Sequence, residues 1–377
     1  MEGVHKLARL LEAATSVELL PGDAAAWAEI AGPDNEHAPF VFIDGNLGIP
    51  EKDLFKVYYV ASKAFSKLPL RSLFEASGTS NASEAGLLEL TSVILLANSA
   101  HQTALNVQKT LVLNGRRTCQ DELKFTATVL TLKQSSKVSM LWHHRRWLLL
   151  RQNLDGETQA LPLSVTDIDF VTLKLPSKIL ADELQVCSSA CETYPRNYYA
   201  WFHRYLCLRC CATRAASDSA EHASLLEQEK NELKRWINLH VSDHSAVHCL
   251  FVVIEALLAV LTTFSDAEAL VMEIRDHALQ LLQSYPSHEN LWLYFRRAFE
   301  QWVTNPATGR VSIPPARTAE DEAKILMNTH KRSSVGKRSD EDKLVVDHAR
   351  CYLTWKGGKW KSGGSDTPRS LTGGDRM

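Results

Sequence analysis

From residue 86 to residue 300, apolar residues return every three or four positions, and the alternation typical of β-strands is hard to find. This spacing predicts a series of amphipathic helices. Tyr194-Pro195 and Tyr285-Pro286 end two of them, because the residue before a proline disfavours the helical conformation. The first helix of each predicted pair covers residues 86–96, 122–132, 182–192, 226–237 and 268–283.

A second helix follows each of these, and it carries a repeated anchor position. Two copies are alike, one from Lys137 to Trp147 and one from Arg196 to Leu206. In each copy a basic residue lies five positions before a Trp, and His and Arg lie two and three positions after it. The anchors of these copies are Trp142 and Trp201, and weaker copies centre on Leu105, Val247 and Trp292.

A helical hairpin cannot bury its apolar face alone, so repeated hairpins stack on one another. We therefore predict an all-α fold, a right-handed superhelical solenoid of helical hairpins (an alpha-alpha superhelix). Positions three apart share a helix face, which places Arg145 beside Trp142 and Arg204 beside Trp201. The indole can fill the space between hairpins, and the guanidinium can stack or pair with an acid of the adjoining hairpin. These residues are interpreted first as packing groups without a ligand.

The two ends of the chain depart from this pattern. Residues 1–85 are predicted to form a helical and irregular N-terminal extension, with helices near 4–14 and 51–68. Residues 86–302 are the predicted repeat solenoid. Residues 303–355 are a predicted loop and C-terminal helix, the helix near 340–355. Residues 356–377 are rich in Gly, Ser and Lys and are predicted to be disordered.

Charge and length exclude several classes of protein. The 377 residues contain 42 Lys and Arg against 44 Asp and Glu, a net charge of −2, so no nucleic-acid partner held by bulk positive charge is expected. The longest apolar run, 249–261, is too short to span a membrane and contains Glu255. No secretory signal pattern is found. We expect a soluble, cytoplasmic protein.

The cysteines and histidines offer only weak candidates for chemistry. Cys207, Cys210 and Cys211 lie close together in sequence, but no second Cys or His pair has zinc-ligand spacing. We expect no metal on this chain and reduced thiols that pack on helix faces. A freestanding zinc or thiol enzyme built on these cysteines is the weakest alternative. His143, His144 and His203 lack a nucleophile or carboxylate at a recognisable spacing.

The stronger anchor copies resemble the protein prenyltransferase alpha-subunit repeat, which reads approximately Asn-Tyr-x-x-Trp-x-x-Arg. Residues 197–204 match it well, and residues 141–146 are close, although Val138 and Ser139 stand in the Asn and Tyr slots. Residues 42–50 and 98–109 resemble a repeat-containing group of this family more than its farnesyltransferase or Rab geranylgeranyltransferase alpha chains. The first copy lacks both Trp and Arg, and the fourth lacks Trp.

The resemblance implies a division of labour between two chains. The alpha chain is a crescent of hairpins wrapped around a beta chain, a helical barrel that carries the zinc and the isoprenoid pocket. It implies that the alpha chain places a basic side chain near the diphosphate, which is Arg196 here, with Lys137 at the same position one repeat earlier and Tyr198 also near. A fixed cation there stabilises the charge of the departing diphosphate. The implied anchor and interface residues are Trp142, His143, Arg145, Asn197, Trp201, His203, Arg204 and Trp292.

Two functions follow from these observations. The first is a non-catalytic alpha subunit of a heterodimeric protein prenyltransferase, with a Rab-type beta subunit and geranylgeranyl transfer to a cysteine of a protein substrate. In that case the chain itself holds no cofactor, and the zinc lies on the partner. The second is an alpha-solenoid interaction scaffold without prenyltransferase activity. The degenerate first and fourth copies favour this function. The substrate protein, the choice between farnesyl and geranylgeranyl and the need for an escort protein stay open.

Overall fold

The computed structural model describes residues 1–32, 35–68, 81–153, 166–217, 219–300, 319–332 and 339–356. Helices dominate these residues, and the predicted all-α repeat fold is confirmed. The chain divides into two compact units, Met1–Gln228 and Glu229–Met377. This division falls inside the predicted repeat region, within helix α12 (Ala220–Leu239). The predicted tail from residue 357 onward and residues 303–318 lie outside the described part of the chain.

The N-terminal extension contains a small sheet that the sequence pattern did not predict. Helix α1 (Glu2–Ala13) and helix α3 (Glu51–Phe65) were expected, and both are found. Between them lie β1 (Ser16–Leu20), the short helices η1 (Ala24–Trp27) and α2 (Ala28–Ala31), β2 (Val41–Ile43) and β3 (Asn46–Pro50). The strand order is β1-β3-β2, with β1 parallel and β2 antiparallel to β3. Strands of three to five residues are too short to show a β period.

Hydrogen bonds tie this extension to the first repeats. Thr131 Oγ1 accepts from Val17 N at 2.9 Å, and Thr128 Oγ1 donates to Ala14 O at 3.0 Å. Lys124 Nζ donates to Glu12 O at 2.8 Å. All three contacts reach α7 or the residue after it, so the extension packs as part of the first unit.

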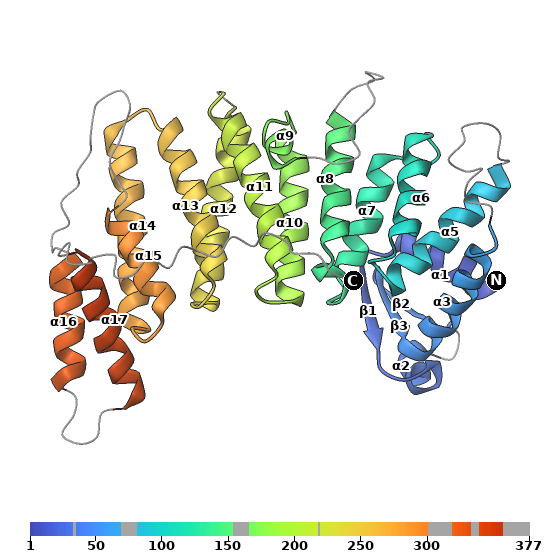
Figure 1. Cartoon of the computed structure of the whole chain (residues 1–377), viewed down its shortest axis with the longest axis horizontal. Helices are drawn as coiled ribbons and strands as arrows, with labels where there is room; N and C mark the ends of the chain where they lie inside the picture. Colours follow the sequence, from blue (N-terminus) through green and yellow to red (C-terminus); the bar gives the residue numbers. More distant parts are fainter. Residues whose placement is uncertain are drawn as a thin grey trace, which may run out of the picture. The chain divides into compact units, whose positions relative to one another are not determined.

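The first unit contains three helical hairpins that follow one another in Figure 1. They are α5 (Asn81–Ala97) with α6 (Gln102–Leu113), α7 (Cys119–Leu130) with α8 (Ser139–Asn153), and α10 (Ser177–Thr193) with α11 (Tyr198–Ala215). The short helices η2 (Ser135–Lys137) and α9 (Asp167–Val171) lie in the connections. Neighbouring hairpins contact each other through α7 and α10 and through α8 and α11. The expected stacking of hairpins is therefore found inside this unit.

The second unit continues the helical pattern. It contains α13 (His244–Val260), the hairpin of α14 (Phe264–Ser284) and α15 (Glu289–Glu300), and the hairpin of α16 (Ala319–Arg332) and α17 (Asp340–Lys356). Helix α17 matches the predicted C-terminal helix, whereas α16 was not predicted. Aromatic rings of Phe251, Tyr294 and Phe295 are fully buried here. Tyr352 of α17 packs against Phe295 and Trp292 of α15.

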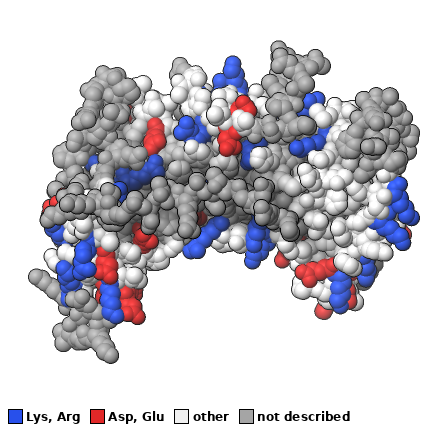
Figure 2. All heavy atoms as spheres, in the orientation of Figure 1, with Lys and Arg blue, Asp and Glu red and all other residues white. Residues whose placement is uncertain are grey.

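The described helices do not include one that is long and apolar enough to cross a membrane. On the face drawn in Figure 2, small groups of Lys and Arg alternate with Asp and Glu over the described residues. Charge of one sign does not form a continuous field on the described part of that face. This distribution fits the near-neutral composition.

A substitution at Gly48 of β3 tests how tightly the sheet packs. A Cβ atom at Gly48 would lie 2.8 Å from Leu20 Cδ1 and 3.4 Å from Val41 Cβ. Gly48→Ala should therefore lower the free energy of unfolding by about 1–3 kcal/mol through overpacking. The control is Gly86→Ala inside α5, where no atom lies within 4 Å of the added Cβ; it should raise that free energy by about 0.5–1 kcal/mol. Urea unfolding measures both, and a shift of the same sign in both variants would contradict this packing.

Candidate functional site

The strongest anchor, Trp142, joins two hairpins through one carbonyl group. Its indole is buried, and Nε1 donates to Ser136 O at 2.9 Å. The same oxygen accepts from Asn197 Nδ2 at 2.9 Å, at the start of α11 in the next hairpin. Asn197 Oδ1 also caps α11 by accepting from Ala200 N. Asn197 therefore fixes where α11 begins relative to the hairpin before it.

The second unit repeats this arrangement with changed partners. Trp292 Nε1 donates to Pro286 O at 2.8 Å, and Asn290 Nδ2 donates to Val241 O at 3.0 Å. In the fourth copy, Asp243 occupies the Asn position and caps α13. Its Oδ2 accepts from Trp236 Nε1 at 3.0 Å. The indole missing from the fourth anchor is thus supplied by the preceding helix.

A buried carboxylate, Glu183 of α10, binds repeated polar residues from both strong copies. Arg145 of α8 binds it through Nε at 3.0 Å and Nη2 at 2.5 Å, and His203 Nε2 donates to it at 2.9 Å. Arg145 Nη1 also donates to Leu123 O and Thr126 Oγ1 in α7. Of the two roles expected for Arg145, stacking or pairing with an acid of the adjoining hairpin, the structure shows the pairing, and one guanidinium joins three helices.

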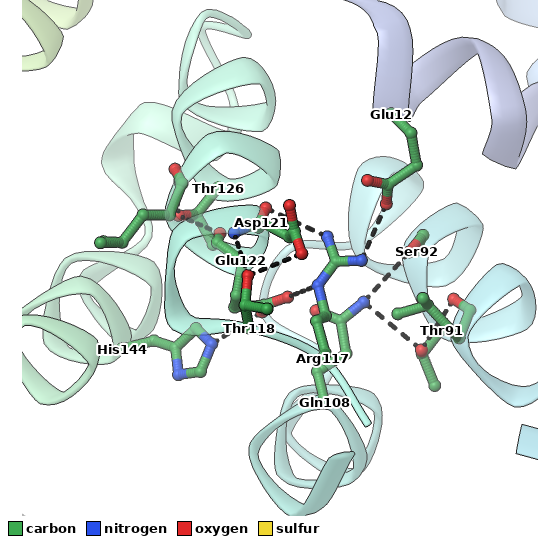
Figure 3. Close-up of polar contacts among 12 residues, drawn as sticks. Glu12, Thr91, Ser92, Gln108, Arg117, Thr118, Asp121, Glu122, Thr126 and His144 are labelled. Atoms are coloured by element: carbon green, nitrogen blue, oxygen red, sulfur yellow. Dashed lines mark hydrogen bonds and ion pairs between the residues drawn. The ribbon is translucent and has the colours of Figure 1, made fainter. Parts of the chain in front are cut away.

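The preceding hairpin has the same arrangement around Glu122 of α7 (Figure 3). His144 Nε2 donates to Glu122 Oε1 at 2.7 Å, and Arg117 Nε donates to Oε2 at 2.5 Å. Arg117 also reaches Glu12 of α1 at 2.9 Å. Gln108 occupies the Arg position of the degenerate first copy and turns toward α5, where its Nε2 bonds to Ser92 Oγ at 3.2 Å. Arg117 therefore supplies the cation that the first anchor helix lacks.

These carboxylates are ionised because of their partners. Burial alone would raise the pKa of Glu183, but Arg145 and His203 outweigh burial and lower it to about 2. Burial would also raise the pKa of Glu122, but His144 and Arg117 outweigh burial and lower it. Burial lowers the pKa of His144 and of His203 despite these acids. Both imidazoles are therefore neutral donors through Nε2, which is a structural role.

The other predicted anchor residues, among them Trp201, Arg204 and His143, differ in burial and in their contacts. Trp201 is buried, and the Arg204 guanidinium lies 5.5 Å from its ring centre and donates to Ser188 Oγ of α10 at 2.9 Å. His143, directly after Trp142, is exposed. Its neighbour His144 makes the buried contact, although sequence reasoning singled out His143. The spacing of His two positions after each Trp was the signal that could have identified His144.

The three residues expected near a diphosphate lie around one turn before α11. Arg196 is exposed and has a φ of 61°, in the left-handed region that few side chains other than Gly and Asn occupy. Lys137 of the previous hairpin places Nζ 3.8 Å from the ring centre of Tyr194, two residues before Arg196. Tyr198 is 68% exposed and stacks on Phe202 with ring centres 6.0 Å apart. The structure thus brings Lys137 to the turn that carries Arg196.

The clustered thiols are buried and bonded to carbonyl groups. Cys210 Sγ lies 3.2 Å from Leu173 O, and Cys211 Sγ lies 3.4 Å from His222 O. Burial raises the pKa of Cys210 to about 11 and raises that of Cys207 as well. A group of three possible metal ligands does not occur among the described residues. These thiols therefore serve as small packing groups between helices.

Comparison with known families identifies the repeat. The model of the protein prenyltransferase alpha subunit repeat matches residues 119–152 and 180–211. These two matches correspond to the hairpins α7/α8 and α10/α11, which hold Glu122 and Glu183. The resemblance inferred from the anchor copies is confirmed.

Similarity to individual proteins covers larger parts of the chain. Protein prenyltransferase alpha subunit repeat-containing protein 1 of Homo sapiens is 30% identical over 246 residues, which is 56% of this chain and 58% of that protein. The protein of the same name from Danio rerio is 26% identical over 75% of this chain and 70% of its own length. Geranylgeranyl transferase type-2 subunit alpha of Homo sapiens is 24% identical over 72% of this chain and 42% of its own length. The chain thus spans less than two thirds of the human relatives that it matches.

Removing the charge of Glu183 should destabilise the first unit. Glu183→Gln leaves the buried cation of Arg145 without its carboxylate, which should cost about 3–5 kcal/mol of unfolding free energy. Asp182→Asn changes the exposed neighbour on the same helix and should stay within about 0.5 kcal/mol of the wild type. Hydrogen exchange of the α7, α8, α10 and α11 amides under native conditions measures both. Equal protection in the two variants would exclude this role for Glu183.

The same network predicts how stability depends on pH. Glu183 has a folded pKa of about 2 against an ordinary value of 4.5, so its contribution is complete above pH 4.5 and is lost as pH falls toward 2. The lowered pKa of His203, ordinarily 6.5, adds a loss that begins as pH falls below 6.5, because the unfolded chain then binds the proton. The unfolding free energy, measured in urea from pH 8 to pH 3, should decline in both windows. Glu183→Gln should reduce the decline in unfolding free energy below pH 4.5.

Proposed function

We propose that this chain, in which residues 119–152 and 180–211 match the protein prenyltransferase alpha subunit repeat, is the non-catalytic alpha subunit of a heterodimeric protein prenyltransferase. The partner in this proposal is a Rab-type beta subunit, and the reaction is transfer of a geranylgeranyl group to a cysteine of a protein substrate. The observation that carries the proposal is the match of the repeat to the two hairpins that share the Glu183 network. The similarity to geranylgeranyl transferase type-2 subunit alpha supports the choice of reaction.

The structure of the anchor helices supports a binding rather than a chemical role for this chain. The histidines at the repeat positions, His144 and His203, are fully buried and bonded to carboxylates. The clustered thiols are buried with raised pKa values, which disfavours the thiolate needed for metal binding or attack. The proposal therefore assigns the zinc and the isoprenoid pocket to the beta subunit.

The turn before α11 is the part of this chain that we assign to the diphosphate. Arg196 and Lys137 are exposed and belong to successive hairpins, so their charges are available to a ligand lying across both. The positive φ of Arg196 is held between Pro195 and the clamped cap Asn197. Strained backbone of this kind persists where the surrounding structure fixes it, and it often marks a functional residue. A pre-oriented cation stabilises the negative charge that develops on a departing diphosphate.

The alternative, a scaffold that kept the repeat and lost prenylation, is favoured by the degenerate first copy. In that copy, Gln108 bonds within its own hairpin, and Arg117 from the following loop takes over the contact with Glu122. Co-expression with a Rab-type beta subunit separates the two functions. A stable heterodimer that transfers geranylgeranyl supports the alpha-subunit proposal, and a heterodimer without transfer supports the scaffold.

Arg196→Asn tests the assigned cation with little disturbance of the backbone, since Asn tolerates a positive φ where Ala is strained. We expect transfer by the heterodimer to fall by about 100-fold, with the complex intact on size-exclusion chromatography because the side chain is exposed. The control is Arg209→Asn, an exposed arginine on α11, which should transfer at the wild-type rate. Unchanged transfer by Arg196→Asn would remove this residue from the diphosphate site.

A further inference from the structure

The turn before α11 carries an aromatic ring over which two lysines lie. This ring belongs to Tyr194, the residue directly after α10, and its side chain is half-buried. Lys137 Nζ lies 3.8 Å from the ring centre, and Lys133 Nζ lies 5.8 Å from the same centre. Both lysines belong to the connection between α7 and α8. One ring of the third hairpin therefore gathers two cations of the hairpin before it.

A hydrogen bond places these lysines beside Arg196. Asn197 Nδ2 donates to Ser136 O at 2.9 Å. Asn197 follows Arg196 directly in the sequence, and Ser136 directly precedes Lys137. Tyr194 stands two residues before Arg196. The ring, the lysines and the arginine therefore belong to one contact between successive hairpins.

The three cations of this contact are accessible to a ligand. Lys133, Lys137 and Arg196 are exposed, and none of them forms an ion pair with another described residue. Glu192, in the last turn of α10, is exposed and is likewise not paired with them in the described part of the chain. An ammonium group has three donors, so a lysine that lies over the Tyr194 ring can still donate to an anion on its outer side.

The second unit shows that the packing of the helices does not require these cations. It has the same clamp, because Asn290 Nδ2 donates to Val241 O at 3.0 Å. The residue after Val241 is Ser242, and the residue before Asn290 is Glu289. The clamp thus forms with a neutral and an acidic neighbour in place of two cations. The basic residues of the first unit are therefore free to serve a role other than packing.

We propose that Tyr194 is a positioning residue that holds Lys133 and Lys137 beside Arg196, so that three cations from two hairpins bind one diphosphate. This inference rests on the proposed prenyltransferase function and adds Tyr194 and Lys133 to its diphosphate site. A diphosphate spreads its charge over two phosphoryl groups, and both lysine and arginine bind phosphate oxygens. A lysine loses conformational freedom when it binds a ligand, so a ring that already restricts it strengthens binding.

Titration of the full chain with inorganic diphosphate at low ionic strength tests this inference without a beta subunit. Tyr194→Leu removes the ring and should weaken binding about fivefold, whereas Tyr194→Phe keeps the aromatic face and should bind as the wild type does. Lys133→Gln should weaken binding about threefold, as expected for the loss of one exposed charge. The matched control is Lys178→Gln, an exposed lysine on α10 outside this turn, which should leave the affinity unchanged.

The heterodimer with the Rab-type beta subunit gives a second readout that separates positioning from folding. Tyr194→Leu should lower kcat/KM for geranylgeranyl diphosphate about fivefold and leave KM for the protein substrate unchanged. Tyr194→Phe should restore the wild-type value. A loss that came from a damaged fold would change the parameters of both substrates and would lower Tm.

Three results would overturn the inference. They are the absence of diphosphate binding by the wild-type chain, equal affinities of Tyr194→Leu and Tyr194→Phe, and an affinity of Lys133→Gln equal to that of Lys178→Gln. A heterodimer that forms but does not transfer geranylgeranyl would contradict the proposed function alone, because the titration of the full chain decides the role of Tyr194 independently.

Discussion

The buried carboxylates Glu122 and Glu183 determine how the hairpins of the first unit fit together. Each carboxylate accepts from the histidine of its own hairpin and from an arginine that precedes the hairpin in sequence. Apolar packing alone would allow neighbouring helices to slide by a turn, whereas a buried charge is tolerated only where its partners reach it. We infer that these carboxylates give the stack its register, while the indoles and aliphatic side chains supply most of the burial.

This constraint divides the polar residues of the anchor helices into two groups. Arg145, His144 and His203 are used inside the stack, where their charge or hydrogen-bonding capacity is satisfied by other parts of the chain. Lys137 and Arg196 lie before α8 and α11, Tyr198 is the first residue of α11, and all three are exposed. Their positions are fixed by the buried group, because Asn197 clamps the turn to the carbonyl of Ser136. Buried and exposed polar residues therefore alternate along one short motif.

Arg145 and Arg146 are adjacent in the sequence but contact different partners. Successive residues of a helix point about 100° apart, so the Arg145 guanidinium binds Glu183 of α10, whereas that of Arg146 lies over the ring of Phe202 of α11 and has no acidic partner in the described part of the chain. The same position in α6 holds Lys109, which also lacks one among the described residues. The repeat thus places basic residues at equivalent positions on these two anchor helices.

The structure shows that Arg145 pairs with an acid of the next hairpin, where the sequence allowed either stacking or pairing. The helical hairpins, the tryptophan anchors and the place of Arg145 on the helix face of Trp142 followed from the sequence, because all depend on positions three or four residues apart on one helix. The identity of that acid did not, since Glu183 is 38 residues away. Two further contacts also required the tertiary structure. Arg117, and not Gln108, supplies the cation beside Glu122, and His144, and not His143, donates to that carboxylate. Strand β1 pairs with β3 through residues 30 positions apart, and all three strands are too short to show a local period. Contacts within one helix can be predicted from the spacing of residues along the sequence. Contacts between elements that are distant in the sequence depend on how those elements pack in the tertiary structure.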